Sequence, residues 1–425
     1  MKAIAAAIWM GGILICMTWT IPSVHAASSG RPEQVHIAIG GIESAGMTIS
    51  WVTATAGESR VKYGQHNASL DLESRATQPA SQYKFCHYTS GYNHHVLLPS
   101  LEPNAQYFYV VGGNESGWSK VLSFRTPPKR GDVDTPLTLG ILGDLGQTNY
   151  SLETLGYIQK NPLVNAVLLA GDLSYADTVQ SRWDAWGTFV EPSTSAIPWM
   201  MAAGNHEIET SCQLTTFDAY QARYRMPFHE SGATRGNLFY SFDVASVHVV
   251  VLTPYIPTYR ASIQFKWAAR DLERVDRRVT PWIVVMMHGP WYSSNRAHQS
   301  NVEPQHAMRK DMEDLLFDHR VHVVLAGHVH SYERTFPVFR HERTVNAPIY
   351  VTIGDGGNRE GLADKYIEPR PVWSAYRKAR YGYGLLQVHN RTHARFEWHE
   401  DKDKTSNVHD SVWLHARTIV EHTRH

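Results

Sequence analysis

Five short motifs, each directly after an apolar run, carry the side chains of this chain that are best suited to chemistry. In chain order they read GDLG, GDLSY, GNHE, VMMH and AGHVH. Leaving His206 aside, they supply the candidate metal ligands Asp144, Asp172, Tyr175, Asn205, His288, His328 and His330. Two carboxylates, a phenol, an amide and three imidazoles are enough for two metal ions. An adjacent pair of metal ions favours hydrolysis of a phosphate ester.

The types of these side chains indicate which metals they suit. Asp and His are common ligands of divalent and ferric ions, and a carboxylate in the middle of the set, such as Asp172, can bridge two metals. Asn205 offers a neutral carbonyl oxygen, which suits the less charged ion. Tyr175 loses its proton in water only near pH ~10, so binding as phenolate requires a strong Lewis acid such as Fe(III). The other interpretation of Tyr175 is an aromatic side chain packed beside the site.

The apolar runs indicate the elements that position these motifs. Continuous apolar stretches suit strands buried on both faces, and they read LTLGIL, AVLLA, IPWMMAA, VHVVVLT, WIVVMM, VHVVLA and PIYVTI. Between them, residues 262–274 and 305–317 have helical patterns. We therefore predict an α/β sandwich over residues 134–420. Its motifs would lie at the ends of strands, where open α/β sheets place their ligands.

The first part of the chain has a different pattern. Short runs rich in β-branched and aromatic residues, such as MTISWV and QYFYVVG, alternate with Gly, Ser, Asn and Pro. Their spacing predicts a small antiparallel β-sandwich over residues 32–127. LEPN at 101–104, followed by Tyr107 and Tyr109, resembles a fibronectin type III module. The segment TPPKRG at 126–131 has the composition of a linker to the second domain.

Length and composition agree with two folded domains. The chain has 425 residues, 43% of them hydrophobic, and its 40 Lys and Arg balance 40 Asp and Glu. This balance gives no net field that would attract nucleic acid or anionic lipid. Lys2, the apolar stretch 3–19 and Ala26 predict a signal peptide over residues 1–26, too short for a membrane anchor. We expect no membrane span later in the chain.

A cleaved signal peptide predicts a secreted protein, and further expectations follow from that. N-glycosylation would be possible at surface sequons, which occur at Asn67, Asn114, Asn149 and Asn390. Cleavage would leave Cys86 and Cys212. A disulfide and two separate thiols are equally compatible with the sequence, because the two residues fall in different predicted domains.

The ordered set DxG, GDxxY, GNH(E), VxxH and GHxH over residues 137–330, with GDGGNREG at 354–361, resembles the signature of the purple acid phosphatases. The β-sandwich in front of it resembles the larger, plant-type form of that family. The resemblance implies Fe(III) held by Asp144, Asp172, Tyr175 and His330. It also implies a divalent ion (Zn, Mn or Fe) held by Asp172, Asn205, His288 and His328, with Asp172 as the bridge. Charge transfer from Tyr175 to Fe(III) would give the purple colour.

The resemblance also implies a reaction, the hydrolysis of small phosphate monoesters by attack of a metal-bound hydroxide. His206, beside the ligand candidate Asn205, is expected to bind phosphate and to protonate the leaving group. Asn205 itself is expected to contact the substrate. The other interpretation of His206 is a structural residue of its loop.

The chain departs from the family pattern after His288. Plant-type members often carry two adjacent His followed by Glu in this region, whereas here only His298 falls near that place and Glu303 is the candidate Glu. We predict both as substrate-binding residues and His298 as a second catalytic residue, with Arg296 and His306 as alternatives. A solvated surface loop is the competing interpretation. Further along the chain, Glu333 or Arg334 is expected to orient a ligand His.

Two rival functions stay open at this stage. Phosphodiester or nucleoside-diphosphate hydrolysis could use the same ligands, because loops outside the motifs decide between substrates. The second rival is a secreted metal-binding or storage protein without catalysis. His206 argues against it, because a storage protein has no use for a proton donor beside the metal ligands. The expected partners are small phosphate esters, with the chain as a monomer or a non-covalent homodimer.

Overall fold

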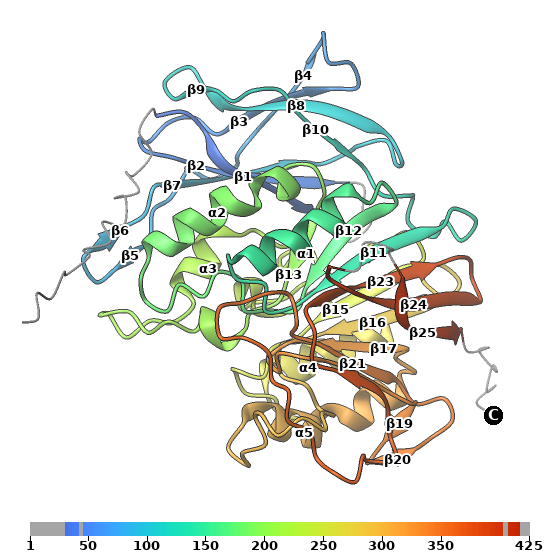
Figure 1. Ribbon diagram of the computed structural model, residues 1–425. Coiled ribbons are helices and arrows are strands. Elements are labelled where there is room, and N and C mark those ends of the chain that lie inside the picture. The colour runs from blue at the N-terminus through green and yellow to red at the C-terminus, as the bar shows by residue number, and fades with distance from the viewer. Residues whose placement is uncertain (1–29, 42–45, 403–406, 417–425) are drawn as a thin grey trace, which may run out of the picture.

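The computed structural model describes residues 30–41, 46–402 and 407–416. The predicted signal peptide lies outside these described residues. An all-β region at the N-terminus (blue to cyan in Figure 1) rests on a larger mixed region that contains the α-helices of the described residues. This is the predicted order of a β-sandwich followed by an α/β sandwich.

The N-terminal region consists of two antiparallel sheets and a separate hairpin. One sheet has the strand order β1-β2-β7, and the other has the order β10-β8-β3-β4, with β9 pairing to β8. Between them lies an apolar core of its own, in which Trp51, Tyr109 and Phe124 are buried. The strands are β1 (Glu33–Ile39), β2 (Met47–Thr53), β3 (Arg60–Gly64), β4 (Leu72–Arg75), β5 (Lys84–Phe85), β6 (Tyr88–Thr89), β7 (Tyr92–Leu98), β8 (Gln106–Gly113), β9 (Gly117–Trp118) and β10 (Leu122–Arg125).

The second region contains two larger mixed sheets, each with a parallel core. The first has the order β13-β12-β11-β23-β24-β25, and the second has the order β14-β15-β16-β17-β21-β18-β22. Strands β11, β12 and β13 run parallel, as do β15, β16, β17 and β21. The bounds are β11 (Leu137–Leu142), β12 (Val164–Leu169), β13 (Trp199–Met201), β14 (Tyr240–Val244), β15 (Val247–Val251), β16 (Trp282–Met286), β17 (Val323–Ala326), β18 (Tyr332–Thr335), β19 (Val338–Phe339), β20 (Glu342–Arg343), β21 (Ile349–Ile353), β22 (Ser374–Lys378), β23 (Gly382–Val388), β24 (His393–Glu400) and β25 (Val408–His415).

Helices flank these sheets, with α1 and α2 on the side of the first sheet and α4 and α5 on the side of the second (Figure 1). Their bounds are α1 (Asn149–Lys160), α2 (Ser181–Thr194), α3 (Asp218–Arg223), α4 (Ile263–Glu273) and α5 (Pro304–Asp318), with short 3₁₀ helices η1 (Asn205–Glu207) and η2 (Gly236–Leu238). The predicted helices 262–274 and 305–317 correspond to α4 and α5. Among the described residues, none of the helices combines the length and the apolar character that crossing a bilayer requires.

The two regions are joined by a buried polar contact and by a disulfide. Arg223 at the end of α3 is buried and donates hydrogen bonds to Tyr83 Oη at 3.1 Å and to Gln34 Oε1 at 3.0 Å. Cys86, in the turn of the β5–β6 hairpin, forms a disulfide with Cys212, with 5.0 Å between their Cα atoms. The disulfide answers the question that the sequence left open, because the hairpin reaches across to the loop before α3.

Candidate metal centre

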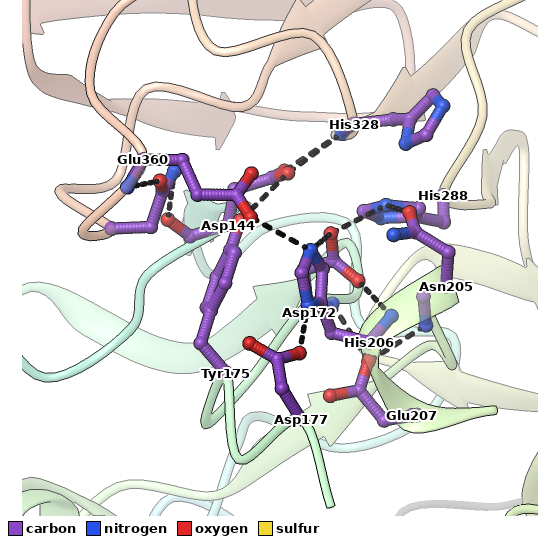
Figure 2. A network of polar contacts seen from close by, with 12 residues as sticks. Asp144, Asp172, Tyr175, Asp177, Asn205, His206, Glu207, His288, His328 and Glu360 are labelled. Atoms are coloured by element: carbon purple, nitrogen blue, oxygen red, sulfur yellow. Dashed lines mark hydrogen bonds and ion pairs between the residues drawn. The ribbon is translucent and has the colours of Figure 1, made fainter. Parts of the chain in front are cut away.

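The five motifs lie together at the carboxyl ends of parallel strands from both sheets. GDLG follows β11, GDLSY follows β12 and GNHE follows β13, all in the first sheet. His288 follows β16, and the GHVH motif follows β17, in the second sheet. Figure 2 shows the labelled members of this group gathered around one centre. Segments separated by up to 186 positions, from Asp144 to His330, thus meet because each strand ends at the same edge.

Asp144, Tyr175 and His330 form the first half of the cluster. The Tyr175 hydroxyl lies 3.3 Å from Asp144 Oδ1 and 3.2 Å from His330 Nε2. His330 Nε2 in turn lies 3.3 Å from Asp144 Oδ1. A phenol oxygen, a carboxylate oxygen and an imidazole nitrogen therefore converge at mutual distances that one metal ion could span.

The second half of the cluster is built around Asp172 and His288. His288 Nε2 lies 3.0 Å from Asp172 Oδ2 and 3.1 Å from Asn205 Oδ1. His328 joins them, since Asp172, His288 and His328 each offer a ligand atom within 4.8 Å of the others. All seven side chains predicted as ligands from the sequence therefore lie in this one cluster.

The charges of the cluster suit bound cations. Asp144 and Asp172 are 0% and 1% exposed, and among the described residues no Lys or Arg lies within ion-pair distance of either. Burial alone would raise the pKa of Asp172, but the imidazoles of His288 and His206 lower it below its ordinary value. Buried carboxylates are stable in their charged form only with positive charge nearby. The donor set of oxygens and imidazole nitrogens fits a pair of metal ions.

Backbone carbonyl groups fix which ring nitrogen of His288 and of His330 is available to a metal. His288 Nδ1 lies 2.7 Å from Ala170 O, and His330 Nδ1 lies 3.0 Å from Gly361 O. Since a carbonyl oxygen only accepts, both Nδ1 atoms donate, and both Nε2 atoms are left as acceptors for a metal. These backbone carbonyls take the place that the sequence analysis gave to Glu333 or Arg334.

The expectation for Glu333 and Arg334 was wrong. The Glu333 carboxylate accepts a hydrogen bond from Ser294 N at 2.6 Å, and Arg334 pairs with Asp410 at 2.7 Å. Among the described residues, neither side chain contacts the imidazole of a ligand candidate. Glu333 holds the loop after β16, and Arg334 ties β18 to β25. Adjacency to GHVH in sequence misled, because both side chains are taken up by other partners, Glu333 by Ser294 and Arg334 by Asp410.

The backbone of the cluster is held in uncommon conformations. Left-handed φ values occur at Asp144 (53°), Asp172 (53°), Tyr175 (51°) and His328 (68°), where non-glycine residues are disfavoured. Two glycines allow close approach. A Cβ at Gly204 would lie 2.1 Å from Asp172 Oδ1, and one at Gly327 would lie 2.2 Å from Asp144 Oδ2. Only glycine fits at these two positions.

His206 lies at the edge of the cluster, held by a residue that the sequence analysis missed. Its Nδ1 is hydrogen-bonded to Asp177 Oδ1, and Asp177 is paired on its other side with Arg359. The opposite nitrogen, Nε2, lies 3.8 Å from Asp172 Oδ2 and 3.6 Å from Glu360 Oε1 (Figure 2). Arg359 and Glu360 belong to the GDGGNREG motif, which was the signal that could have pointed to them.

Glu207, the last residue of GNHE, ties two of the motifs together. Its buried carboxylate accepts hydrogen bonds from the backbone N–H groups of Asp172, Leu173 and Gly204 at 2.8, 2.9 and 2.8 Å. Burial and the neighbouring charge of Asp172 raise the pKa of Glu207 to about 8, against the effect of these N–H donors. The loop after β12 is therefore locked to the loop after β13. Sequence reasoning gave this residue no role.

The loop after β16 places His298 and Glu303 against His328. Glu303 Oε2 lies 3.3 Å from His328 Nε2, and Glu303 Oε1 lies 3.2 Å from His298 Nδ1. The rings of His298 and His328 lie 3.8 Å apart, centroid to centroid. Because Nε2 of His328 meets Glu303, Nδ1 is the nitrogen left for a metal. The side chain of Arg296 lies apart from the cluster, donating to Tyr366 O.

Comparison with known proteins shows to which family the chain belongs. The model described as "Purple acid Phosphatase, N-terminal domain" matches residues 32–126, "Calcineurin-like phosphoesterase" matches 137–332, and "Iron/zinc purple acid phosphatase-like protein C" matches 347–411. Purple acid phosphatase 22 of Arabidopsis thaliana is 43% identical over 390 residues, covering 91% of this chain and 86% of the relative. The chain belongs to the purple acid phosphatase family. It is accordingly an acid phosphatase of the metallophosphoesterase fold.

Further similarities agree with membership of the purple acid phosphatase family. The "Fe(3+)-Zn(2+) purple acid phosphatase 12" of Arabidopsis thaliana is 40% identical, over 90% of this chain and 84% of the relative. The metals in its name agree with the predicted cofactors, Fe(III) and one divalent ion. The solved purple acid phosphatase from yellow lupin seeds shares the fold, with a TM-score of 0.80 at 24% identity, over 91% of this chain and 74% of that one.

Proposed function

We propose that this chain is a secreted acid phosphatase that hydrolyses phosphate monoesters at a binuclear centre. The observation that carries the proposal is the convergence of two buried carboxylates with a phenol, an amide and three imidazoles, without a Lys or Arg partner for Asp144 or Asp172 among the described residues. The ferric site would be held by Asp144, Asp172, Tyr175 and His330. The divalent site would be held by Asp172, Asn205, His288 and His328.

The metal pair, when bound, would supply positive charge for the phosphate oxygens and an activated water as nucleophile. The protein's own residues would do the rest. Tyr175, a phenol whose pKa burial and the Asp144 and Asp172 charges raise well above its ordinary value, would stay protonated without a strong Lewis acid. This argues for ferric rather than divalent iron or zinc on the Tyr175 side.

His206 is proposed as the residue that binds phosphate and protonates the leaving group. Burial opposes its charged form, but the carboxylates of Asp172 and Asp177 outweigh burial and raise the pKa of His206 above its ordinary value. At acidic pH the ring would therefore carry the proton that a general acid needs. With Nδ1 donating to Asp177, that proton would leave from Nε2, which faces the cluster.

Glu303 is proposed to act mainly through His328, although the sequence suggested a direct contact with substrate. A carboxylate on the far nitrogen of a ligand His fixes its ring and makes it a better donor. His298, which packs against the same ring at a tilt and is 37% exposed, stays a candidate for contact with the substrate.

Secretion is part of the proposal and has two supports. The disulfide Cys86–Cys212 suits an oxidising compartment. The four sequons, at Asn67, Asn114, Asn149 and Asn390, are all exposed and thus open to N-glycosylation. With both described cysteines paired within the chain, a monomer or a non-covalent homodimer is proposed. We also propose residues 32–127 and 134–420 as the two domains after a signal peptide at 1–26.

The test combines metal analysis with substrate comparison on the purified protein. One iron and one divalent ion per chain, with visible absorption, are expected, together with faster hydrolysis of p-nitrophenyl phosphate than of bis(p-nitrophenyl) phosphate. A His206→Ala variant should lose about 10²-fold or more on an alkyl phosphate, and less on p-nitrophenyl phosphate, whose leaving group needs little protonation. Two divalent ions and a preference for the diester would favour a phosphodiesterase. A metal-loaded protein without turnover would favour a storage role.

A further inference from the structure

A cavity of about 350 Å³ lies directly beside the metal centre. Three of its wall positions are continuous with the centre: Pro290 follows His288 by two residues, Val329 stands between His328 and His330, and the ring of His298 packs against that of His328. A substrate with its phosphate at the centre would have this cavity within reach of its leaving group. The volume is in the range of small-molecule sites.

The polar lining of the cavity is cationic or neutral. Arg309, His306 and His341 contribute to the wall, together with His298, and none of the lining residues is acidic. Arg309 and His306 lie one turn apart in the first half of α5, so the helix also directs its positive end toward this region. An anion entering the cavity would meet a positive potential.

Arg309 is the centre of this arrangement because its charge is not neutralised. Its guanidinium lies 5.3 Å over the Tyr292 ring, and its Nη1 donates to His341 Nε2 at 2.6 Å. Burial and the neighbouring Arg309 lower the pKa of His341, so the neutral ring can accept this bond. In the part of the chain that the structure describes, no carboxylate lies within ion-pair distance of Arg309.

Aromatic side chains form part of the wall. Trp291 lines the cavity and is 3% exposed. Tyr292 and Trp373 supply apolar surface around it.

We propose that this cavity, with Arg309 as its cation, binds a second anionic group carried by the leaving group of the substrate. The substrate class would be phosphate monoesters whose alcohol part bears a carboxylate or another phosphate. This inference rests on the proposed monoesterase activity and adds a specificity to it.

The test compares matched esters. 3-Phosphoglycerate and glycerol 3-phosphate differ by a carboxylate, and fructose 1,6-bisphosphate and fructose 6-phosphate differ by a phosphate. The wild-type protein is expected to favour the ester with the second anion about 10-fold or more in kcat/KM, from one charge-assisted hydrogen bond. In Arg309→Met the preference should collapse, chiefly through KM, with Arg309→Lys in between. A gain confined to one pair would identify the anion as carboxylate or phosphate.

Lys310→Met is the matched control. Lys310 is the next residue of α5, is exposed and does not line the cavity, so its removal takes away one positive charge without touching the proposed site. It should keep the wild-type preference. Metal content and thermal unfolding of each variant would separate a local effect from loss of fold.

Three results would overturn the proposal. One is a wild-type protein with no preference within either pair, a measurement that needs no variant to fold. Another is equal loss on all four esters in Arg309→Met, which would mean a structural role. The third is an equal loss of preference in Lys310→Met, which would mean a long-range charge effect. If the wild-type protein hydrolysed none of these esters, the proposed function itself would fail.

Discussion

Asp177 offers the sharpest test of how the centre positions its proton donor. It accepts the hydrogen bond from His206 Nδ1 and is itself paired with Arg359. Replacing Asp177 by Ala removes this support and leaves His206 free to rotate about its side chain. Replacing it by Asn removes only the charge, because the amide oxygen can still accept from Nδ1–H.

The size of each effect follows from the kind of bond that is lost. A hydrogen bond to a charged group contributes about 1.5–3 kcal/mol, and a neutral one contributes roughly half as much. Since about 1.4 kcal/mol corresponds to tenfold in rate, Asp177→Ala is expected to lower kcat/KM about 10- to 100-fold. Asp177→Asn keeps a neutral bond and is expected to lose about 5-fold.

The assay is kcat/KM on an alkyl phosphate, with iron and divalent metal measured on the same samples. Asp177 is not among the proposed ligands, so metal content and colour should stay at the wild-type level. Asp134→Ala, a substitution of an exposed Asp outside the five motifs, is the control and should have wild-type kinetics.

Two results would refute the reasoning. If Asp177→Ala kept kcat/KM within about threefold of wild type, the contact between Asp177 and His206 would be irrelevant to catalysis. If Asp177→Asn were as damaged as Asp177→Ala, retaining an acceptor would have no value, and the graded loss predicted from the hydrogen bond would be wrong.

Three further predictions concern other parts of the molecule. Tyr175→Phe should abolish the visible absorption and lower the iron content, and a band that survives would exclude a phenolate ligand. Burial opposes the charged form of His248, but the hydrogen bonds that its ring donates to Asp243 and Asp271 raise its pKa to about 9. Because the pKa of His in the unfolded chain is ~6.5, this stabilisation is complete below pH ~6.5 and is lost as the pH rises to about 9. The free energy of unfolding, measured in urea, should therefore fall over this pH range by up to about 3 kcal/mol less in His248→Gln than in the wild-type protein. Cys86→Ser with Cys212→Ser should lower the free energy of unfolding by about 2–5 kcal/mol, measured the same way, because the disulfide closes a loop of 126 residues.

The fold and the ligand cluster could be predicted because the signals for both are local in sequence. Each ligand candidate follows an apolar run within a few residues, and parallel strands bring such ends to one edge. The runs LTLGIL and AVLLA became β11 and β12 with Asp144 and Asp172 just beyond them. The helix at 262–274 was predictable for the same reason, with Ser262 as its N-terminal cap.

The contacts that support the cluster could not be predicted, because they join distant segments. Asp177 and Arg359 are 182 positions apart, and nothing in either neighbourhood indicates that they meet. The partner of Cys212 depended on where the β5–β6 hairpin docks, which no periodicity encodes. Glu303 lies in a predicted loop region, where spacing gives neither direction nor partner.

The strained backbone of the metal centre links the folding of the two sheets to the binding of metal. Left-handed conformations at Asp144, Asp172 and His328 cost of order 1–3 kcal/mol each. They persist because buried strands hold the residues before them, and because the Glu207 carboxylate ties the loops after β12 and β13. The ligands are therefore in place before two metal ions bind. Folding of the sheets supplies the free energy that holds the buried charges together. It follows that a variant such as Glu207→Ala should lose metal affinity before it loses the fold, because the sheets remain while the loops relax.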